Sequence, residues 1–147
     1  NKIFYEFRNF KYTIKPFNDL KKILFLLIKK KIKLTILTNG NVEIQKKKIH
    51  NLNLKKYFNY IFFARKVYKD KPSITTFKIV LNKIKAKNSE TLMIGDDYYT
   101  DIIGAKKAGL RTLLLYNTFK IYYNKKNIDY KTKSLKSLFL ILNKIIT

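Results

Sequence analysis

Short apolar segments alternate with amphipathic ones along most of this chain, and that alternation limits the fold more than any other feature. Nearly unbroken apolar runs predict buried strands at residues 34–38, 60–63, 91–94 and 111–116. Apolar residues at helical spacing predict helices at residues 20–28, 42–52, 73–84, 100–108 and 135–146. Continuous apolar strands separated by helices are typical of a parallel sheet that is covered on both faces, so we predict an α/β fold.

The size and composition of the chain exclude several classes of protein. Its 147 residues fit one domain. The absence of cysteine excludes disulfide bonds and thiolate metal sites. No apolar run approaches the ~20 residues that a membrane span requires, and no signal peptide is visible. We therefore expect no membrane span and a cytoplasmic location.

The net charge of +24 has two interpretations. The basic residues are nearly all lysine, with arginine only at Arg8, Arg65 and Arg111, and the lysines are spread along the whole chain. Abundant Lys, Ile, Asn, Tyr and Phe are also what AT-rich codons produce, which favours a solvated lysine surface. A polyanion-binding role is the alternative, although phosphate and base recognition favours arginine.

Three carboxylates lie within six residues at the predicted end of the third strand. They belong to Asp96, Asp97 and Asp101, and Gly95 before them allows a tight turn. Crowded carboxylates repel one another, and Mg²⁺, which prefers hard oxygen ligands, would offset that repulsion. Helix capping is the other interpretation, with Asp97 at the N-cap and Asp101 in the first turn.

Two further polar residues stand where the predicted elements begin or end. Thr38 ends the first predicted strand, and its hydroxyl and the amides that follow could hold a phosphoryl oxygen. The alternative interpretation is an ordinary turn, because Asn39-Gly40 is a common turn dipeptide. Lys71 stands before Pro72 and a predicted helix, where it could neutralise a phosphate or a carboxylate.

The order of these three signals resembles the haloacid dehalogenase-like hydrolase superfamily. Thr38 in KLTILTNG resembles the second motif of the superfamily, and Lys71 in KDKPSITTF resembles the third. The segment MIGDDYYTDIIGAKKAGLRTLLL resembles the fourth motif and the strand that follows it. The stretch between Thr38 and Lys71 also resembles the members that carry a helical cap inserted after the first motif. The resemblance covers roughly residues 16–118.

This resemblance implies a Rossmann-like three-layer sandwich with a mainly parallel sheet, and it assigns roles by position. Asp96 and Asp97 would hold Mg²⁺, and Asp101 would support the metal or position Lys71. The residues expected to bind phosphate are Thr38, Asn39, Gly40 and Lys71. The residues expected to be catalytic are Thr38, Lys71 and Asp101.

The first motif of the superfamily is absent from this sequence. That motif is a central strand ending in Asp-x-Asp, in which the first Asp is the nucleophile and the second a general acid and base. No such strand precedes Thr38, and Asp19 follows Pro16 at the start of a helix. We expect residues 1–15 to be the tail and hinge of the helical cap, and residues 16–147 to be the core without its first strand. A fragment of a longer phosphatase, beginning at Asn1 within the cap, is favoured over a degenerate relative.

The favoured function is a Mg²⁺-dependent phosphatase of a small phosphorylated metabolite, such as phosphoglycolate, a nucleotide or a sugar phosphate. The alternative is a non-catalytic module that binds nucleic acid through its positive charge. Gly95-Asp96-Asp97 also resembles the metal-binding hairpin of RNA-dependent polymerases, in which a β-strand follows the acidic pair. Residues 102–109 predict a helix there instead.

Overall fold

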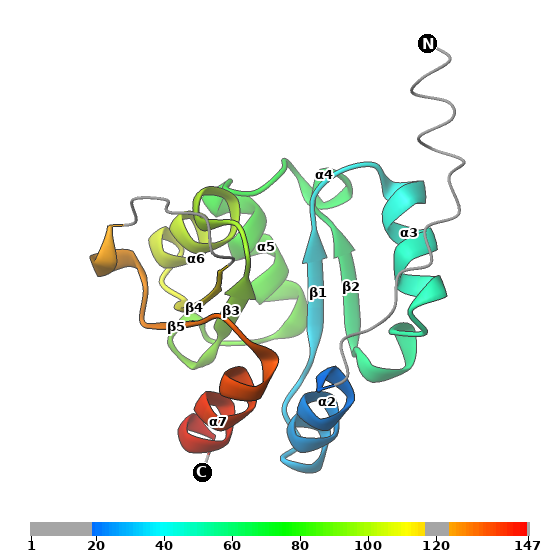
Figure 1. Ribbon diagram of the computed structural model, residues 1–147. Coiled ribbons are helices and arrows are strands. Elements are labelled where there is room, and N and C mark those ends of the chain that lie inside the picture. Colours follow the sequence, from blue (N-terminus) through cyan, green and yellow to red (C-terminus); the bar gives the residue numbers. More distant parts are fainter. Residues whose placement is uncertain (1–18, 117–123, 147) are drawn as a thin grey trace.

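Strands and helices alternate along the part of the chain that the computed structural model describes, residues 19–116 and 124–146 (Figure 1). The strands are β1 (Thr35–Thr38), β2 (Tyr60–Phe63), β3 (Leu92–Gly95), β4 (Arg111–Leu115) and β5 (Tyr130–Thr132). The helices are α2 (Leu20–Lys29), α3 (Val42–Asn51), α4 (Ala64–Val67), α5 (Ile74–Ile84), α6 (Gly104–Lys107) and α7 (Leu135–Ile145). Short 3₁₀ turns occupy Lys55–Tyr57, Asn88–Glu90 and Lys125–Asn127, and a π-helical segment, Tyr98–Ile103, leads into α6.

All the strand pairs are parallel, as the continuous apolar runs predict. β1 pairs with β2, β3 pairs with β4, and β4 pairs with β5. The strands nevertheless form two sheets, β1-β2 and β3-β4-β5, and no ladder joins β1 to β3 within the described residues. The α/β class and the parallel direction are confirmed.

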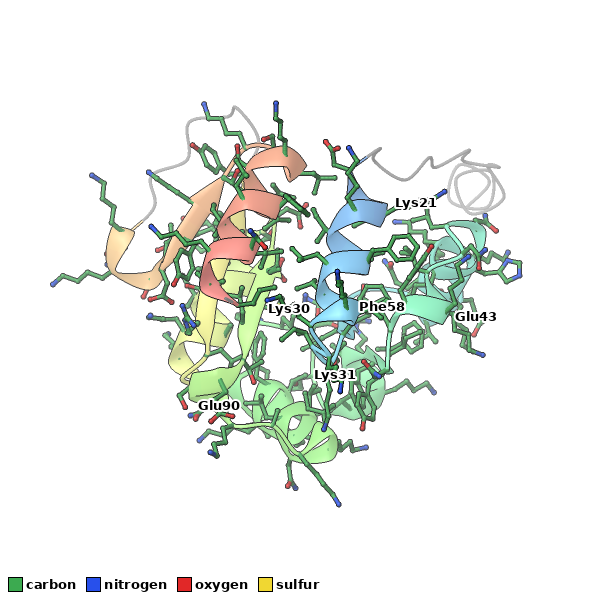
Figure 2. All side chains as sticks on the ribbon, turned by 90° about the horizontal axis from the view of Figure 1, so that it is seen from below. Lys21, Lys30, Lys31, Glu43, Phe58 and Glu90 are labelled. Atoms are coloured by element: carbon green, nitrogen blue, oxygen red, sulfur yellow. The ribbon has the colours of Figure 1, made fainter. Side chains whose placement is uncertain are left out.

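Successive side chains of the strands point to opposite faces, and both faces are covered by helices. Leu113 of β4 packs with buried residues of α2 and α7, which lie side by side on one face (Figures 1 and 2). Leu114 packs against Tyr98 and Ile102 instead. Leu37 of β1 and Met93 of β3 pack against the cluster that α5 and α6 form. The two sheets therefore share a layer of α5 and α6 although no backbone ladder connects them.

The element that follows β3 differs in detail from its prediction. The helix expected at residues 100–108 begins as a π-helix at Tyr98, and Gly109 follows its end with a φ of 86°. This left-handed backbone confirms Gly109 as the residue that terminates the helix. The strand β5 was not predicted, because it has three residues and Lys131 interrupts its apolar pattern. The expected cap tail and hinge at residues 1–15 lie outside the described residues.

Across the described ranges, no helix is both long enough and apolar enough to cross a membrane.

A polar cluster holds the start of β5 against β4. The Asp129 carboxylate accepts hydrogen bonds from Lys106 Nζ at 2.7 Å and from the Thr112 amide at 2.8 Å. The buried Thr112 hydroxyl donates to the Asn127 carbonyl at 2.7 Å. Burial acts to raise the pKa of Asp129, but the bonds from Lys106 and Thr112 outweigh it and lower the pKa below its usual value.

We predict that Asp129 makes the fold sensitive to acid. Because its pKa is lower in the folded state, its ionised form contributes stability above the unfolded pKa, and this contribution is lost as the pH falls through the folded pKa. The unaltered chain should therefore lose more stability between pH 6 and a pH of about 3 than Asp129→Asn does. The check is the urea midpoint of both chains at each pH. Equal losses in the two chains would contradict this role for Asp129.

Candidate functional site

The residues singled out in the sequence gather at one edge of the fold, in the loops that follow β1 and β3 and in the segment before α5. The carboxyl ends of parallel strands meet at the same edge, which is where ligands of such folds bind. β1 ends at Thr38 and β3 ends at Gly95. After β1 the chain turns at Gly40, whose φ of 92° is a conformation that glycine adopts without strain. Asn41 then caps α3, because its side chain accepts the amides of the first turn.

Residues 96–101 follow β3 and are called the acidic loop below. They are tightly packed around Asp101. A Cβ atom added to Gly95 would lie 2.6 Å from Asp101 Cγ and closer still to Asp101 Oδ2, so only glycine fits there. The Asp97 carboxylate accepts the Thr100 amide at 2.7 Å and caps the helical segment that follows. The capping interpretation is therefore correct for Asp97. Asp97 is nevertheless exposed, so this bond to the Thr100 amide holds its carboxylate at the surface.

Asp101 and Lys71 form a buried ion pair. Lys71 Nζ lies 2.5 Å from Asp101 Oδ1, and the two side chains are only 8% and 7% exposed. The second carboxylate oxygen, Oδ2, accepts the Asp97 amide at 3.3 Å. The pair thus connects the segment before α5 with the acidic loop after β3, although the two residues are 30 positions apart.

The loop after β1 reaches the same lysine through its backbone. Asn39 Oδ1 accepts the Lys71 amide at 2.8 Å, and Asn39 Nδ2 donates to the Lys71 carbonyl at 3.0 Å. Asn39 therefore holds the backbone of Lys71, Asp101 holds the Nζ end of its side chain, and Asp101 in turn accepts the Asp97 amide. These bonds link the loop of one sheet to the loop of the other.

The remaining predicted residues lie on the rim of this network. Thr38 is half-buried, and its hydroxyl donates to the adjacent Asn39 carbonyl at 3.2 Å. Gly40 and Asp96 are exposed. Within residues 19–116 and 124–146, the Asp96 carboxylate makes no ion pair and no side-chain hydrogen bond, so its charge is available to a ligand.

The donor atoms of the acidic loop fit a magnesium ion. The described ranges contain no cluster of three or more His, Asp or Glu side chains arranged around one point. Asp96 and Asp97 are nevertheless adjacent, exposed carboxylates, whereas Asp101 is engaged by Lys71. Mg²⁺ in phosphoryl-transfer sites uses one or two carboxylates together with waters and substrate oxygens, so a third protein carboxylate is not required.

Two contacts of the site were not predicted. Asn39 was singled out for its backbone amide, whereas the structure shows its side chain bound to Lys71, a contact across 32 residues that no local pattern signals. Tyr98 is buried, and its hydroxyl accepts the Asn124 amide at 2.9 Å and Asn127 Nδ2 at 3.0 Å. Tyr98 therefore anchors the acidic loop to residues 124–127.

The polymerase hairpin is excluded by the structure after Asp97. That motif requires a β-strand directly after the acidic pair. The chain instead forms helix over Tyr98–Ile103 and Gly104–Lys107. The prediction of a helix at this place is confirmed.

Comparison with known sequences identifies one family and several phosphatases. Residues 2–115 match the family described as haloacid dehalogenase-like hydrolase. A glyceraldehyde 3-phosphate phosphatase of Pyrococcus furiosus is 30% identical over 143 residues, which are 94% of this chain and 59% of that protein. An N-acylneuraminate-9-phosphatase of Homo sapiens is 30% identical over 99 residues, 67% of this chain and 40% of that protein. The chain spans about half the length of these curated relatives.

Solved structures of similar fold cover most of this chain. A HAD-hydrolase of Bacillus subtilis, crystallised with magnesium, has a TM-score of 0.77 and 28% identity over 86% of this chain and 56% of its own. A HAD phosphatase of Thermococcus onnurineus also has a TM-score of 0.77, with 27% identity over 86% of this chain and 57% of its own. Both are similar to this chain over little more than half of their own length.

Proposed function

Because this chain belongs to the haloacid dehalogenase-like hydrolase family, we propose that it forms the phosphate- and metal-binding part of a Mg²⁺-dependent phosphatase. The observation that carries the proposal is the buried Lys71–Asp101 pair, which joins the segment before α5 to the acidic loop after β3, while Asn39 of the loop after β1 bonds to the Lys71 backbone. The substrate is a small phosphorylated metabolite such as phosphoglycolate, a nucleotide or a sugar phosphate. The phosphatase names of the curated relatives support this class.

The loop after β1 and the buried lysine hold the phosphoryl group. The Thr38 hydroxyl and the amides of Asn39 and Gly40 donate to phosphoryl oxygens. Lys71 neutralises negative charge between the phosphoryl group and the attacking carboxylate, and Asp101 sets the direction of the Lys71 side chain. Phosphoryl transfer depends chiefly on such positioning and charge neutralisation.

The acidic loop holds the metal. Asp96 and Asp97 supply carboxylate oxygens at the exposed end of β3. When bound there, Mg²⁺ supplies positive charge beside the phosphoryl oxygens. Asp97 is held in place by its bond to the Thr100 amide, whereas Asp96 is free of such contacts among the residues described.

The attacking carboxylate lies on a strand between β1 and β3. β1 and β3 each have an edge without a partner in the ladders described, and Ile94 of β3 is 36% exposed although its neighbours are half-buried. The sequence contains no Asp-x-Asp. On the inserted strand, the first Asp attacks phosphorus while the bond to the ester oxygen breaks, and the second Asp protonates that oxygen. Water then hydrolyses the aspartyl phosphate, which releases phosphate and restores the carboxylate.

The test is hydrolysis of para-nitrophenyl phosphate with Mg²⁺, by this chain and by the chain extended with the residues encoded upstream of Asn1. We expect no turnover by the chain alone, because it has no Asp-x-Asp, and turnover that stops on adding EDTA in the extended protein. An inactive extended protein whose upstream residues hold no Asp-x-Asp strand would overturn the proposal.

Nucleic-acid binding is the second candidate function, and the net charge of +24 is the observation that favours it. Lys21, Lys30 and Lys31 are exposed on and after α2, on the side of the molecule seen in Figure 2. We expect only weak and nonspecific affinity for single-stranded RNA. A micromolar or tighter affinity that falls steeply with salt, measured by fluorescence anisotropy, would favour this function instead.

A further inference from the structure

We infer that the Asn39 side chain is a positioning group, which holds Lys71 by its backbone and so fixes the lysine relative to the phosphate-binding loop. This inference rests on the proposed function. It assigns the Asn39 side chain the task of holding Lys71, whereas the backbone amide of Asn39 donates to the phosphoryl group. The three residues Asn39, Lys71 and Asp101 are called the relay below.

The two bonds from Asn39 to Lys71 require a primary amide. Oδ1 accepts the Lys71 amide at 2.8 Å while Nδ2 donates to the Lys71 carbonyl at 3.0 Å. An amide side chain offers a donor and an acceptor side by side, whereas a carboxylate offers acceptors only and alanine offers neither. Because both bonds reach the same residue, they fix its orientation as well as its distance.

Asn39 lies in the turn between β1 and α3. β1 ends one residue earlier at Thr38, and the turn at Gly40 leads into α3. Asn41 accepts the Glu43 and Ile44 amides at 3.0 Å and 3.2 Å, which fixes the start of that helix. The Asn39 side chain therefore projects from the turn between β1 and α3, and the Asn41 cap acts on the start of α3 rather than on Lys71.

The other end of the relay, Asp101, lies in the helical segment that follows β3 of the second sheet. Lys71 Nζ contacts Asp101 Oδ1 at 2.5 Å, and Asp101 Oδ2 accepts the Asp97 amide at 3.3 Å. β1 and β3 share no ladder in the part of the chain described. The relay therefore connects the loop that follows β1 with the segment that follows β3, at the edge where both bind the phosphoryl group in the proposed function. Loss of the Asn39 bonds would leave the lysine attached to the acidic loop but free to shift relative to Thr38.

The test compares Asn39→Ala with Asn41→Ala in two measurements on the chain in the presence of Mg²⁺. The first is hydrogen exchange of the Lys71 amide by NMR, and the second is the affinity for inorganic phosphate. Asn41→Ala is the matched control, because it also removes two hydrogen bonds between an asparagine side chain and nearby backbone groups, while in the described residues the Asn41 side chain bonds to Glu43 and Ile44 rather than to Lys71. Asn39→Asp keeps the acceptor for the Lys71 amide and loses the donor.

We expect Asn39→Ala to raise the exchange rate of the Lys71 amide and to weaken phosphate binding, each about tenfold, from the loss of bonds of ordinary strength. Asn41→Ala should change neither the exchange rate nor the phosphate affinity. Asn39→Asp keeps the acceptor, so it should leave the Lys71 amide protected from exchange even if Asn39→Ala folds poorly. Phosphate binding that is equal in Asn39→Ala and the unaltered chain would overturn the inference alone. An unaltered chain that does not bind phosphate would overturn the proposed function, and the inference with it.

Discussion

Replacement of Lys71 by methionine is expected to lower the free energy of unfolding by about 3–5 kcal/mol, the cost of leaving one partner of a buried pair without the other. Lys71 and Asp101 are both buried, and their side chains meet at 2.5 Å. In Lys71→Met the Asp101 carboxylate would keep only weaker partners, of which the Asp97 amide at 3.3 Å is one. Urea unfolding, followed by circular dichroism, measures the loss.

Two further variants separate the charge of the pair from its packing. Lys71→Met combined with Asp101→Leu removes both charges, so much of the lost stability should return. Lys87→Met removes the lysine of an exposed pair with Glu90, and should cost at most about 1 kcal/mol. If Lys71→Met were no more destabilising than Lys87→Met, the pair could not be the buried link between the segment before α5 and the acidic loop.

Replacement of Asp96 by asparagine is expected to lower kcat/KM for para-nitrophenyl phosphate about 1,000-fold in the upstream-extended protein. The reason is the loss of several kcal/mol of transition-state stabilisation by the metal. Asp96 is exposed, and within the described residues its carboxylate makes no ion pair and no side-chain hydrogen bond, so its replacement should barely alter stability. A large loss of activity with an unchanged urea midpoint distinguishes a ligand of the metal from a structural carboxylate.

Glu90→Gln is the matched control for Asp96→Asn. Glu90 ends the short 3₁₀ turn just before β3, whereas Asp96 follows the other end of that strand. The control removes one carboxylate of the same strand region, and it should leave kcat/KM within about twofold, since exposed substitutions have small effects. Activity of Asp96→Asn within tenfold of the parent protein would contradict its role in holding the metal.

Much of the fold could be predicted because its signals are local. The apolar runs that became β2 and β4, and the spacing that became α5, depend on residues close together in the sequence. The strand ends at Thr38 and Gly95 could be placed for the same reason. β5 could not, because a three-residue strand is specified by its contact with β4 rather than by its own composition.

The candidate site could be predicted only in part, because its central contacts join distant segments. The order of Thr38, Lys71 and the acidic loop was visible in the sequence. The two bonds from Asn39 to the backbone of Lys71 were not, since they depend on how the loop after β1 meets the segment before α5. The capping role of Asp97 was one of two interpretations, and the contact with the Thr100 amide establishes it.

Binding of inorganic phosphate to this chain, mapped by NMR with and without Mg²⁺, tests most directly whether the two loops form one pocket. We predict that phosphate shifts the amide signals of Asn39 and Gly40 together with those of Asp96 and Asp97, and that Mg²⁺ strengthens the binding. Shifts spread over the exposed lysines, with no dependence on Mg²⁺, would contradict the pocket and leave only the general attraction of a positively charged surface for anions.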